Sequence, residues 1–326
     1  MNEILGIHHV TAITGSAQDN LDFYTNVLGL RLVKKSVNQD SPDTYHLFFA
    51  DANGTPGTDL TFFPWADSPP VKNGIGLAVE VSLAIPHGSA SYWRHRLTEI
   101  GTTITGEESR RSEVAIMLHD PFGQPLALVE TVDDRDFAPW TRSAVPGEHQ
   151  IRGLHAVRLW ERDLALTEDF LVNVLDFKSM GEDSGWHRYG VGAGGSGKHL
   201  DIREIPSADR GQWGVGGIHH VAWRVKDDAA ELRVRERIQN AHRRPTEVID
   251  RFWFRSVYFL EPGGVLFELA TDGPGFAIDE SADTLGERLV LPPWLEPNRA
   301  EIEAALPPLR VDGPHTAAPT ITRCEG

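Results

Sequence analysis

The chain has 326 residues and a formal net charge of −16, with 40% hydrophobic and 24% charged residues. This composition is ordinary for a globular protein with its own hydrophobic core, and the length predicts about two domains. The acidic balance argues against nucleic acid or an anionic membrane as a partner, because both require basic patches. No run of about 18 apolar residues is present, so no membrane-spanning helix is expected.

The cysteine content and the first residues bear on the cellular compartment. Cys324 is the single cysteine, so no intramolecular disulfide is expected. Residues 1–5 carry no basic segment and no long apolar stretch, so no signal peptide is expected. Both features favour a cytoplasmic location. Residues after Pro314 are expected to form a disordered tail.

In chain order, the first segment predicts a strand, a helix and three further strands. Apolar residues between Leu21 and Leu28 have the spacing of one helical face, with Asp19 as the expected N-cap and Gly29 as the end. The strands around this helix are separated by Gly, Pro and Asn. They are expected over residues 6–13, 30–37, 44–50 and 59–63.

The same β-α-β-β-β order is expected three more times. Residues 170–175 repeat the pattern of residues 23–28, which lie 147 positions earlier. The stretch 134–151 is the expected boundary between an N-terminal domain, residues 1–140, and a C-terminal domain, residues 150–273. An extension and tail follow over residues 274–326. The four modules are expected over residues 4–65, 72–133, 152–206 and 217–273.

A short phrase with two adjacent histidines occurs twice in this pattern. Residues 6–10 and residues 217–221 both read GIHHV, and each phrase opens an apolar strand. A third apolar strand carries Glu268, and a buried carboxylate is costly unless it is paired or metal-bound. Imidazole and carboxylate suit a divalent first-row metal, and three such ligands leave coordination positions open. The sequence therefore predicts a three-ligand metal site.

Strand geometry limits which histidines can share one metal. Adjacent strand residues point to opposite faces, so one histidine of each pair is expected to face the metal and the other to face away. The ligands are then either His8 with His219, or His9 with His220. Alternation alone leaves both pairs open.

The internal repeats favour the second histidine of each pair. The third module has Ala156 where the first has His9, and the second module has Ala127 where the fourth has Glu268. Core-filling residues would recur at matching positions, whereas His9, His220 and Glu268 occur together only once. Eight further histidines lie in polar or loop contexts and are expected to have no role in the site: His46, His87, His95, His149, His187, His199, His242 and His315.

These stretches together resemble the vicinal-oxygen-chelate superfamily of glyoxalases, bleomycin-resistance proteins and extradiol dioxygenases. The narrower resemblance is to dioxygenases that cleave hydroquinone and chlorohydroquinone rings. It implies an α+β fold in which four βαβββ modules form two domains with half-barrel sheets, followed by the extension. The stretches that carry the resemblance are Ile7–Thr14, Tyr24–Asn38, His219–Trp223, Arg251–Phe259 and Leu291–Glu296.

The resemblance also implies an Fe(II) site between the first and fourth modules, with His9, His220 and Glu268 as ligands and Mn(II) as the alternative metal. His219 or Tyr258 is then expected to take the substrate proton, and Arg251, with Arg255 as its competitor, to stabilise developing negative charge. Substrate contacts are expected from His8, Thr11, Trp223 and Phe252, with Phe254 as a further wall; for the aromatic residues, core packing is the competing interpretation.

The expected reaction is Fe(II)-dependent insertion of O2 into a hydroquinone-type ring, so the partners are a small aromatic substrate and O2. Two enzymatic alternatives stay open, namely extradiol cleavage of a catechol and a non-oxidative, glyoxalase-like isomerase or lyase. A metal-free binding protein is the alternative from another class. Self-association into a homo-oligomer through a sheet edge or the extension is left open.

Overall fold

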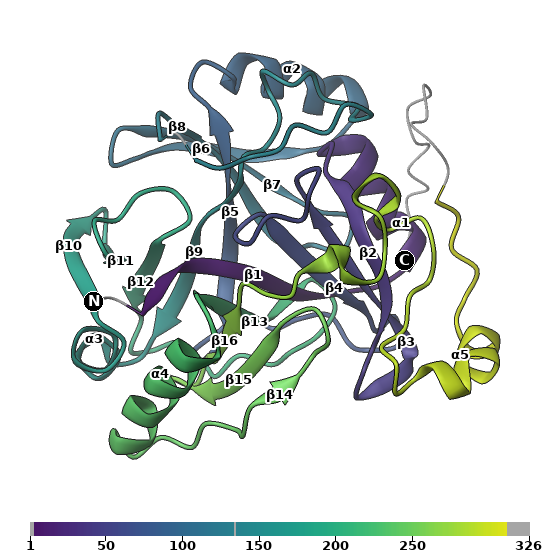
Figure 1. Cartoon of the computed structure of the whole chain (residues 1–326). Helices are drawn as coiled ribbons and strands as arrows, with labels where there is room; N and C mark the ends of the chain where they lie inside the picture. The colour runs from purple at the N-terminus through teal and green to yellow at the C-terminus, as the bar shows by residue number, and fades with distance from the viewer. Residues whose placement is uncertain (1–2, 134, 312–326) are drawn as a thin grey trace.

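The computed structural model describes residues 3–133 and 135–311, and within them the strands form two eight-stranded sheets (Figure 1). Both sheets are curled into half-barrels with helices on their outer faces, which confirms the α+β class and the four modules. The expected tail after Pro314 and Cys324 lie outside the described residues. None of the described helices is long and apolar enough to cross a bilayer.

The first module has the expected order, but its helix starts earlier than predicted. Ser16 is the N-cap, because its hydroxyl accepts a hydrogen bond from the backbone N–H of Asp19. The prediction that Asp19 is the cap is wrong, since Asp19 lies within the first turn. The module consists of β1 (Ile4–Thr14), α1 (Ala17–Asp22), a π-helical turn (Phe23–Val27), β2 (Arg31–Asn38), β3 (Ser41–Ala50) and β4 (Asp59–Pro64).

The other three modules repeat this order. The second contains β5 (Ala78–Pro86), α2 (Ala90–Ile100), β6 (Ile104–Arg110), β7 (Glu113–His119) and β8 (Pro125–Thr131). The third contains β9 (Gly153–Glu161), α3 (Leu164–Asn173), β10 (Phe177–Asp183), β11 (Trp186–Val191) and β12 (His199–Glu204). The fourth contains β13 (Gly217–Val225), α4 (Asp228–Asn240), β14 (Ile249–Asp250), β15 (Arg255–Leu260) and β16 (Leu266–Thr271).

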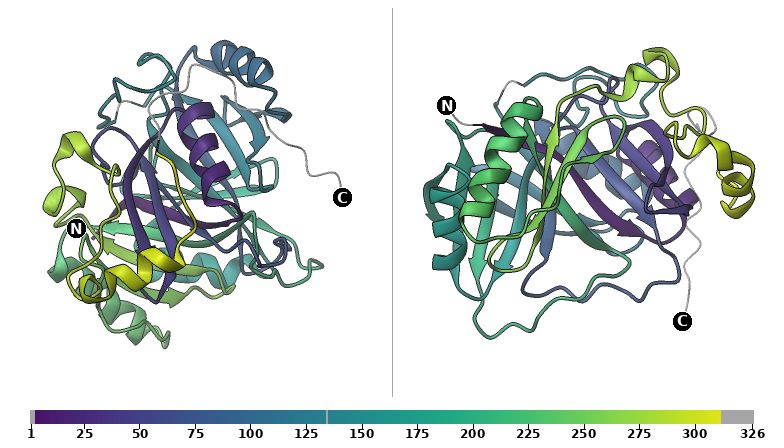
Figure 2. Two further views of the ribbon diagram at one scale, coloured as in Figure 1. Left: turned by 90° about the vertical axis from the view of Figure 1, so that its right-hand side faces the viewer. Right: turned by 60° about the horizontal axis from the view of Figure 1, so that its bottom comes forward.

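Each sheet combines one module from each half of the chain. The strand order β14-β15-β16-β13-β1-β4-β3-β2 joins the fourth module to the first, and β10-β11-β12-β9-β5-β8-β7-β6 joins the third to the second. The linkers before β5 and before β13 run side by side (Figure 2, right). Each sheet therefore contains strands from both residues 1–140 and residues 150–273, and the division of the chain into these two domains stays a prediction.

The two faces of the first sheet have different surroundings because strand side chains alternate. Val10, Val221 and Phe267 project into the main hydrophobic core, toward the helices that cover the outer face. The inner face carries a smaller cluster that includes Phe48, Trp253 and several alanines. This inner, concave face is where the polar residues of interest lie.

The C-terminal extension covers part of that concave face. Its Phe276, Leu285 and Val290 belong to the same cluster as Phe48 and Trp253. Figure 2 (left) shows the extension beside the purple strands of the first module. Its elements are the 3-10 turns Phe276–Ile278, Ala282–Thr284 and Glu296–Asn298, and α5 (Arg299–Ala305).

A buried lysine fixes the extension to the first module. The Nζ atom of Lys34, on β2, donates hydrogen bonds to Asp279 Oδ1 at 2.7 Å, to Glu280 Oε2 at 2.6 Å and to the carbonyl of Phe276 at 3.0 Å. It also lies 5.3 Å from the ring centroid of Trp253. Lys34 is fully buried, and these partners offset the cost of removing its charged group from water.

We expect Lys34→Ala to lower the free energy of unfolding by about 3–5 kcal/mol, because it leaves buried Glu280 without its cationic partner. Urea unfolding at pH 7 measures this change. The control is Lys178→Ala on β10, an exposed lysine whose loss should change stability by less than about 0.5 kcal/mol. Equal losses in the two variants would contradict the assigned role of Lys34.

A buried carboxyl pair joins the third and fourth modules. Glu261 accepts hydrogen bonds from the Thr167 hydroxyl and from the backbone N–H groups of Gly263 and Val265. None of the described residues donates a hydrogen bond to the Glu161 carboxyl group. A Cβ atom at Gly263 would lie 1.6 Å from Glu161 Oε2, so glycine makes room for this carboxyl. Burial and the adjacent charge of Glu261 raise the pKa of Glu161 to about 9.

This pair predicts that stability falls as the pH rises. The folded-state pKa of Glu161 lies above its ordinary 4.5, so its stabilising contribution is complete below pH 4.5 and is lost as the pH rises toward about 9. Glu161→Gln mimics the protonated side chain, so this variant should be more stable than wild type at pH 9. Urea unfolding at pH 5, 7 and 9 tests this, with Glu99→Gln on exposed α2 as control. If the free energy of unfolding of Glu161→Gln fell with rising pH as steeply as that of wild type, the role assigned to Glu161 would be contradicted.

Candidate metal centre

Three adjacent strands bring the predicted ligands together. Strand β1 pairs with β13, and β13 pairs with β16, so Ala222 is the register partner of both His9 and Glu268. Directly paired residues share one face of a sheet. His220 lies two residues before Ala222 and therefore shares that face. All three side chains project from the concave face of the first sheet.

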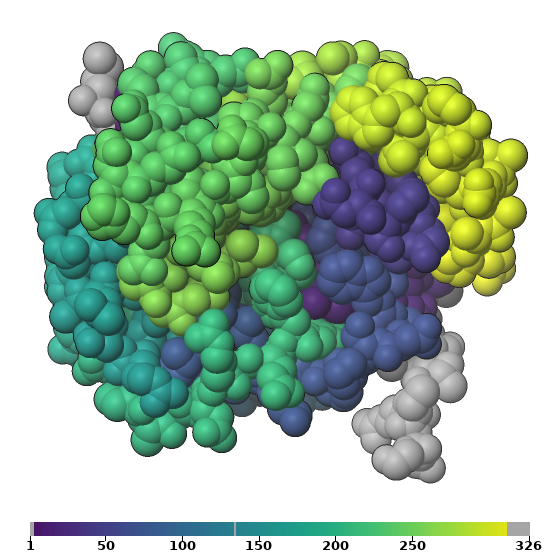
Figure 3. Space-filling model, turned by 90° about the horizontal axis from the view of Figure 1, so that it is seen from below, coloured from purple at the N-terminus to yellow at the C-terminus, as the bar shows by residue number. Residues whose placement is uncertain are grey.

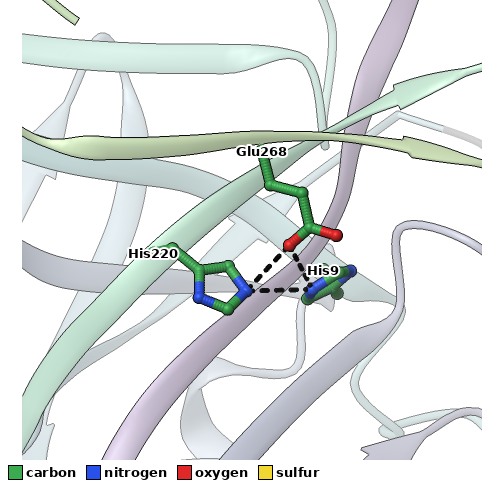
Figure 4. A group of neighbouring side chains, drawn as sticks. All are labelled: His9, His220 and Glu268. Carbon is green, nitrogen blue, oxygen red and sulfur yellow. Dashed lines mark hydrogen bonds and ion pairs between the residues drawn. The ribbon is translucent and has the colours of Figure 1, made fainter. Parts of the chain in front are cut away.

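The ligand atoms of these residues converge (Figure 4). The distance from His9 Nε2 to His220 Nε2 is 3.3 Å, and Glu268 Oε2 lies 3.3 Å from His9 Nε2 and 2.9 Å from His220 Nε2. Ligands bound at about 2.1 Å to one ion lie about 3 Å apart at right angles, so the donor set fits one divalent ion. In the part of the chain that the structure describes, no other group of three His, Cys, Asp or Glu residues converges in this way.

The electrostatics of Glu268 and His220 favour the forms that can bind a metal. Burial raises the pKa of Glu268, but His9 and His220 outweigh burial and hold that pKa well below its usual range. Burial lowers the pKa of His220, which favours the neutral imidazole that a metal requires. The second oxygen of Glu268 accepts a hydrogen bond from the Ser256 hydroxyl at 2.5 Å, which fixes the carboxylate plane.

The first histidine of each pair does not face away, so the prediction from strict alternation is wrong. Register shifts leave His8 on β1 and His219 on β13 as extra residues without a partner in the β1–β13 ladder. Such bulges re-aim side chains. As a result, His8 Nδ1 lies 2.9 Å from His9 Nδ1, and His219 Nδ1 lies 2.8 Å from His220 Nδ1.

These contacts define the ring tautomers. A neutral histidine that binds a metal through Nε2 carries its proton on Nδ1. With a metal on Nε2, His9 and His220 would donate from Nδ1 to the Nδ1 lone pairs of His8 and His219. Burial, followed by the adjacent histidine, lowers the pKa of both His8 and His219 to about 3, so both are neutral acceptors. Partners of this kind orient metal-binding rings.

A cavity of about 420 Å³ opens onto the ligand atoms. Figure 3 shows the corresponding hollow between the green surface of the fourth module and the purple and blue surface of the first. The polar lining of the cavity includes residues 38–41, at the β2–β3 hairpin. Its walls are aromatic, as expected of a site for an aromatic ring; they comprise Phe48, Phe63, Trp65, Trp253 and Phe254.

The predicted residues His219, Tyr258 and Arg251 line this cavity. Tyr258 is the register partner of Glu268, and burial followed by the charge of Glu268 raises its pKa, so it stays a protonated donor. Arg251 lies with its guanidinium carbon 5.5 Å from the Tyr258 ring centroid and donates to Asp40 Oδ2 at 2.9 Å. The competitor Arg255 does not line the cavity and pairs with Asp228.

Four residues predicted to contact substrate do not line the cavity. Trp223 projects into the main core, where its ring packs against Phe177 and Phe267, so the core interpretation was right for this residue. His8 lies beside His9, and the Thr11 hydroxyl is bonded to Thr61 at 2.7 Å. The fourth residue, Phe252, contacts Trp253 and Trp294.

His46 was expected to have no role in the site, but it lines the cavity from β3. Burial, followed by the charges of His9 and His220, lowers the pKa of His46 well below its usual range, so the ring is neutral. The strand at residues 44–50 was predicted, and alternation along it places His46 on the same face as Phe48. Whether that face of β3 points into the cavity depends on the pairing of β3 with β1 through β4, which the sequence does not show.

On the concave face of the second sheet, no comparable set of three ligands converges among the residues that the structure describes. Arg110 donates to Glu80 and Glu108 there, and Arg188 forms a two-point contact with Asp201. These buried ion pairs occupy the face that the first sheet leaves open.

Comparison with known proteins identifies the family. The model of the Glyoxalase/Bleomycin resistance protein/Dioxygenase superfamily matches residues 6–128. The chain is 41% identical over 307 residues to the "Putative ring-cleaving dioxygenase MhqO" of Bacillus subtilis (strain 168), covering 94% of this chain and 97% of that one. It is 34% identical over 308 residues to the chlorohydroquinone/hydroquinone 1,2-dioxygenase of Sphingobium indicum, covering 91% and 94%.

A solved structure extends the likeness to three dimensions. The crystal structure of a "putative dioxygenase" from Bacillus subtilis superposes with a TM-score of 0.90 at 39% identity, covering 96% of this chain and 100% of that one. The expected resemblance is thereby confirmed along nearly the whole chain. With its two histidines and one glutamate converging on the concave face of a half-barrel, this chain belongs to the glyoxalase/bleomycin resistance protein/dioxygenase superfamily.

Proposed function

We propose that this chain is an Fe(II)-dependent dioxygenase that cleaves the ring of a hydroquinone-type substrate. The observation that carries the proposal is the convergence of His9, His220 and Glu268 at the cavity. Two histidines and one carboxylate on one side of an ion leave positions open on the other side, as in non-haem Fe(II) oxygenases. The names of the ring-cleaving relatives support the reaction class, and the Sphingobium relative supports a para-diphenol.

Fe(II) bound by these ligands supplies open positions for a phenolate oxygen and O2, and a path for electrons from the ring to O2. The protein's own groups hold the ring. The aromatic side chains Phe48, Phe63 and Phe254 exclude water and define a slot for a flat substrate. Phe254 also packs 5.3 Å from the ring centroid of His9, so the slot is continuous with the ligands.

Charged and polar groups at the cavity act on the substrate's oxygens. Arg251 is a permanent cation within the cavity lining, placed to stabilise negative charge that develops on the opening ring. Tyr258 is a protonated donor next to Glu268 and can hydrogen-bond the phenolate oxygen. Neutral His219 accepts from His220 at Nδ1, so its proton lies on Nε2, and this N–H group can donate a hydrogen bond to a substrate oxygen.

We expect anaerobically iron-loaded protein to consume O2 when hydroquinone is added and to form a ring-opened, newly absorbing product. Oxygen-electrode measurements with catechol, and with methylglyoxal plus glutathione, are the comparisons. Uptake with catechol alone would favour extradiol cleavage. Absence of uptake with either phenol, from protein shown to hold one iron per chain, would overturn the dioxygenase proposal. Turnover of methylglyoxal and glutathione would then favour a glyoxalase-like reaction.

Removal of a ligand should abolish metal binding while leaving the fold intact. Partners of metal ligands alone change metal affinity about 10–100-fold, so Glu268→Ala and His220→Ala should each weaken iron binding by more than about 100-fold. Iron analysis after dialysis and circular dichroism measure metal content and fold. The matched control is His199→Ala, a buried strand histidine of the second sheet, which should retain iron. Retained iron in either ligand variant would contradict the assignment.

A further inference from the structure

The cavity contains one histidine that the metal centre leaves unused. His46 is half-buried, and its ring centroid lies 3.9 Å from that of Phe48 and 4.4 Å from that of Phe63. Two aromatic contacts at these distances hold the imidazole in one orientation. One of its nitrogens, Nε2, lies 2.9 Å from Thr61 Oγ1.

This contact continues to the strand that carries His9. Thr61 Oγ1 lies 2.7 Å from Thr11 Oγ1, and both hydroxyls are fully buried. Thr61 is the register partner of Thr11, and Thr11 is the register partner of His220. A row of hydrogen-bonding side chains therefore runs across β1, β4 and β3, from a position beside the ligands to His46.

The tautomer of His46 follows from the hydrogen-bond donors and acceptors in this row. Within residues 3–133 and 135–311, the Thr11 hydroxyl has Thr61 as its single hydrogen-bond partner, so it must donate to Thr61 to avoid a buried, unpaired proton. Thr61 then donates its own proton to His46 Nε2. The imidazole is neutral, because burial and the charges of His9 and His220 lower the pKa of His46. Its single proton therefore sits on Nδ1.

The Nδ1–H group is a free donor at the cavity. The described residues offer it no hydrogen-bond acceptor, and His46 belongs to the cavity lining. Strand β3 lies two strand spacings, about 10 Å, from β1, which carries His9. In an ortho-diphenol substrate, the second oxygen would lie beside the oxygen that binds the metal and would stay near the candidate ligands. In a para-diphenol, the second oxygen would lie on the far side of the ring and would extend toward β3.

We infer that His46 donates a hydrogen bond from Nδ1 to the substrate oxygen that lies across the ring from the metal-bound oxygen, and thereby selects para-diphenols. Thr61 and Thr11 are positioning residues that hold the donor tautomer. This inference rests on the proposed function and adds to it the residue that recognises the second hydroxyl group.

Ligand binding without turnover tests this assignment. The Fe(II)-loaded protein is titrated under anaerobic conditions with hydroquinone, 4-methoxyphenol and 4-methylphenol. The first two present an oxygen that can accept from Nδ1–H, whereas the third presents a methyl group. One hydrogen bond of ordinary strength corresponds to about tenfold in affinity. Wild type should therefore bind hydroquinone and 4-methoxyphenol about tenfold more tightly than 4-methylphenol.

In His46→Phe, which keeps an aromatic ring without an N–H group, the three dissociation constants should fall within about twofold of one another. The affinity for 4-methylphenol and the iron content should stay at wild-type values. A preference for hydroquinone that survives His46→Phe, in an enzyme whose wild type consumes O2 with hydroquinone, would overturn this inference alone. Wild type that neither binds these phenols nor consumes O2 would overturn the proposed function and this inference together.

The positioning role of Thr61 has a separate test, which also serves if His46→Phe does not fold. Thr61→Val removes the hydroxyl at nearly constant volume, so the preference for hydroquinone over 4-methylphenol should fall. Thr61→Ser restores the hydroxyl and should restore the preference. If Thr61 had only a structural role, its substitution would change stability but not the ratio of the dissociation constants for 4-methylphenol and hydroquinone. An unchanged ratio in Thr61→Val would therefore overturn the assigned row of hydrogen bonds.

Discussion

The antiparallel pairing of β1 with β13 is the constraint on which the rest of the structure depends. It joins the first module to the fourth across the middle of one sheet. The candidate ligands lie on these two strands and on β16, which pairs with β13. A shift of this register by one residue would turn His9 to the helix-covered face and Val10 to the concave face. The pairing therefore positions the ligands and at the same time completes the core.

Two irregularities in the same pairing give the site its second layer. A regular ladder would point His8 and His219 away from the ligands. The bulges instead place each of them against its neighbouring ligand, with nitrogen atoms 2.9 and 2.8 Å apart. The same device on both strands produces two equivalent supports. The orientation of each imidazole is thus set by the adjacent residue of its own strand.

Much of the fold and of the candidate site was predictable from local pattern. The strand and helix periods gave the four modules, and the comparison of repeats favoured His9, His220 and Glu268 over the alternative pair. What depends on pairing was not predictable from local pattern: the bulges and the place of His46 were not foreseen, and only the family resemblance implied that the first module meets the fourth. Trp223 was wrongly assigned to the cavity for the same reason. The local sequence around an apolar strand residue does not indicate whether its side chain faces the core or the cavity.

The wide separation of the candidate ligands in the chain has a consequence for synthesis. His9 belongs to the first strand and Glu268 to the last, with the second and third modules between them. While the chain grows on the ribosome, β1 waits without its neighbour β13 until three modules have been made. The site can form only when nearly the entire chain has emerged. A prematurely terminated chain that lacks the fourth module would therefore retain His9 alone of the three ligands.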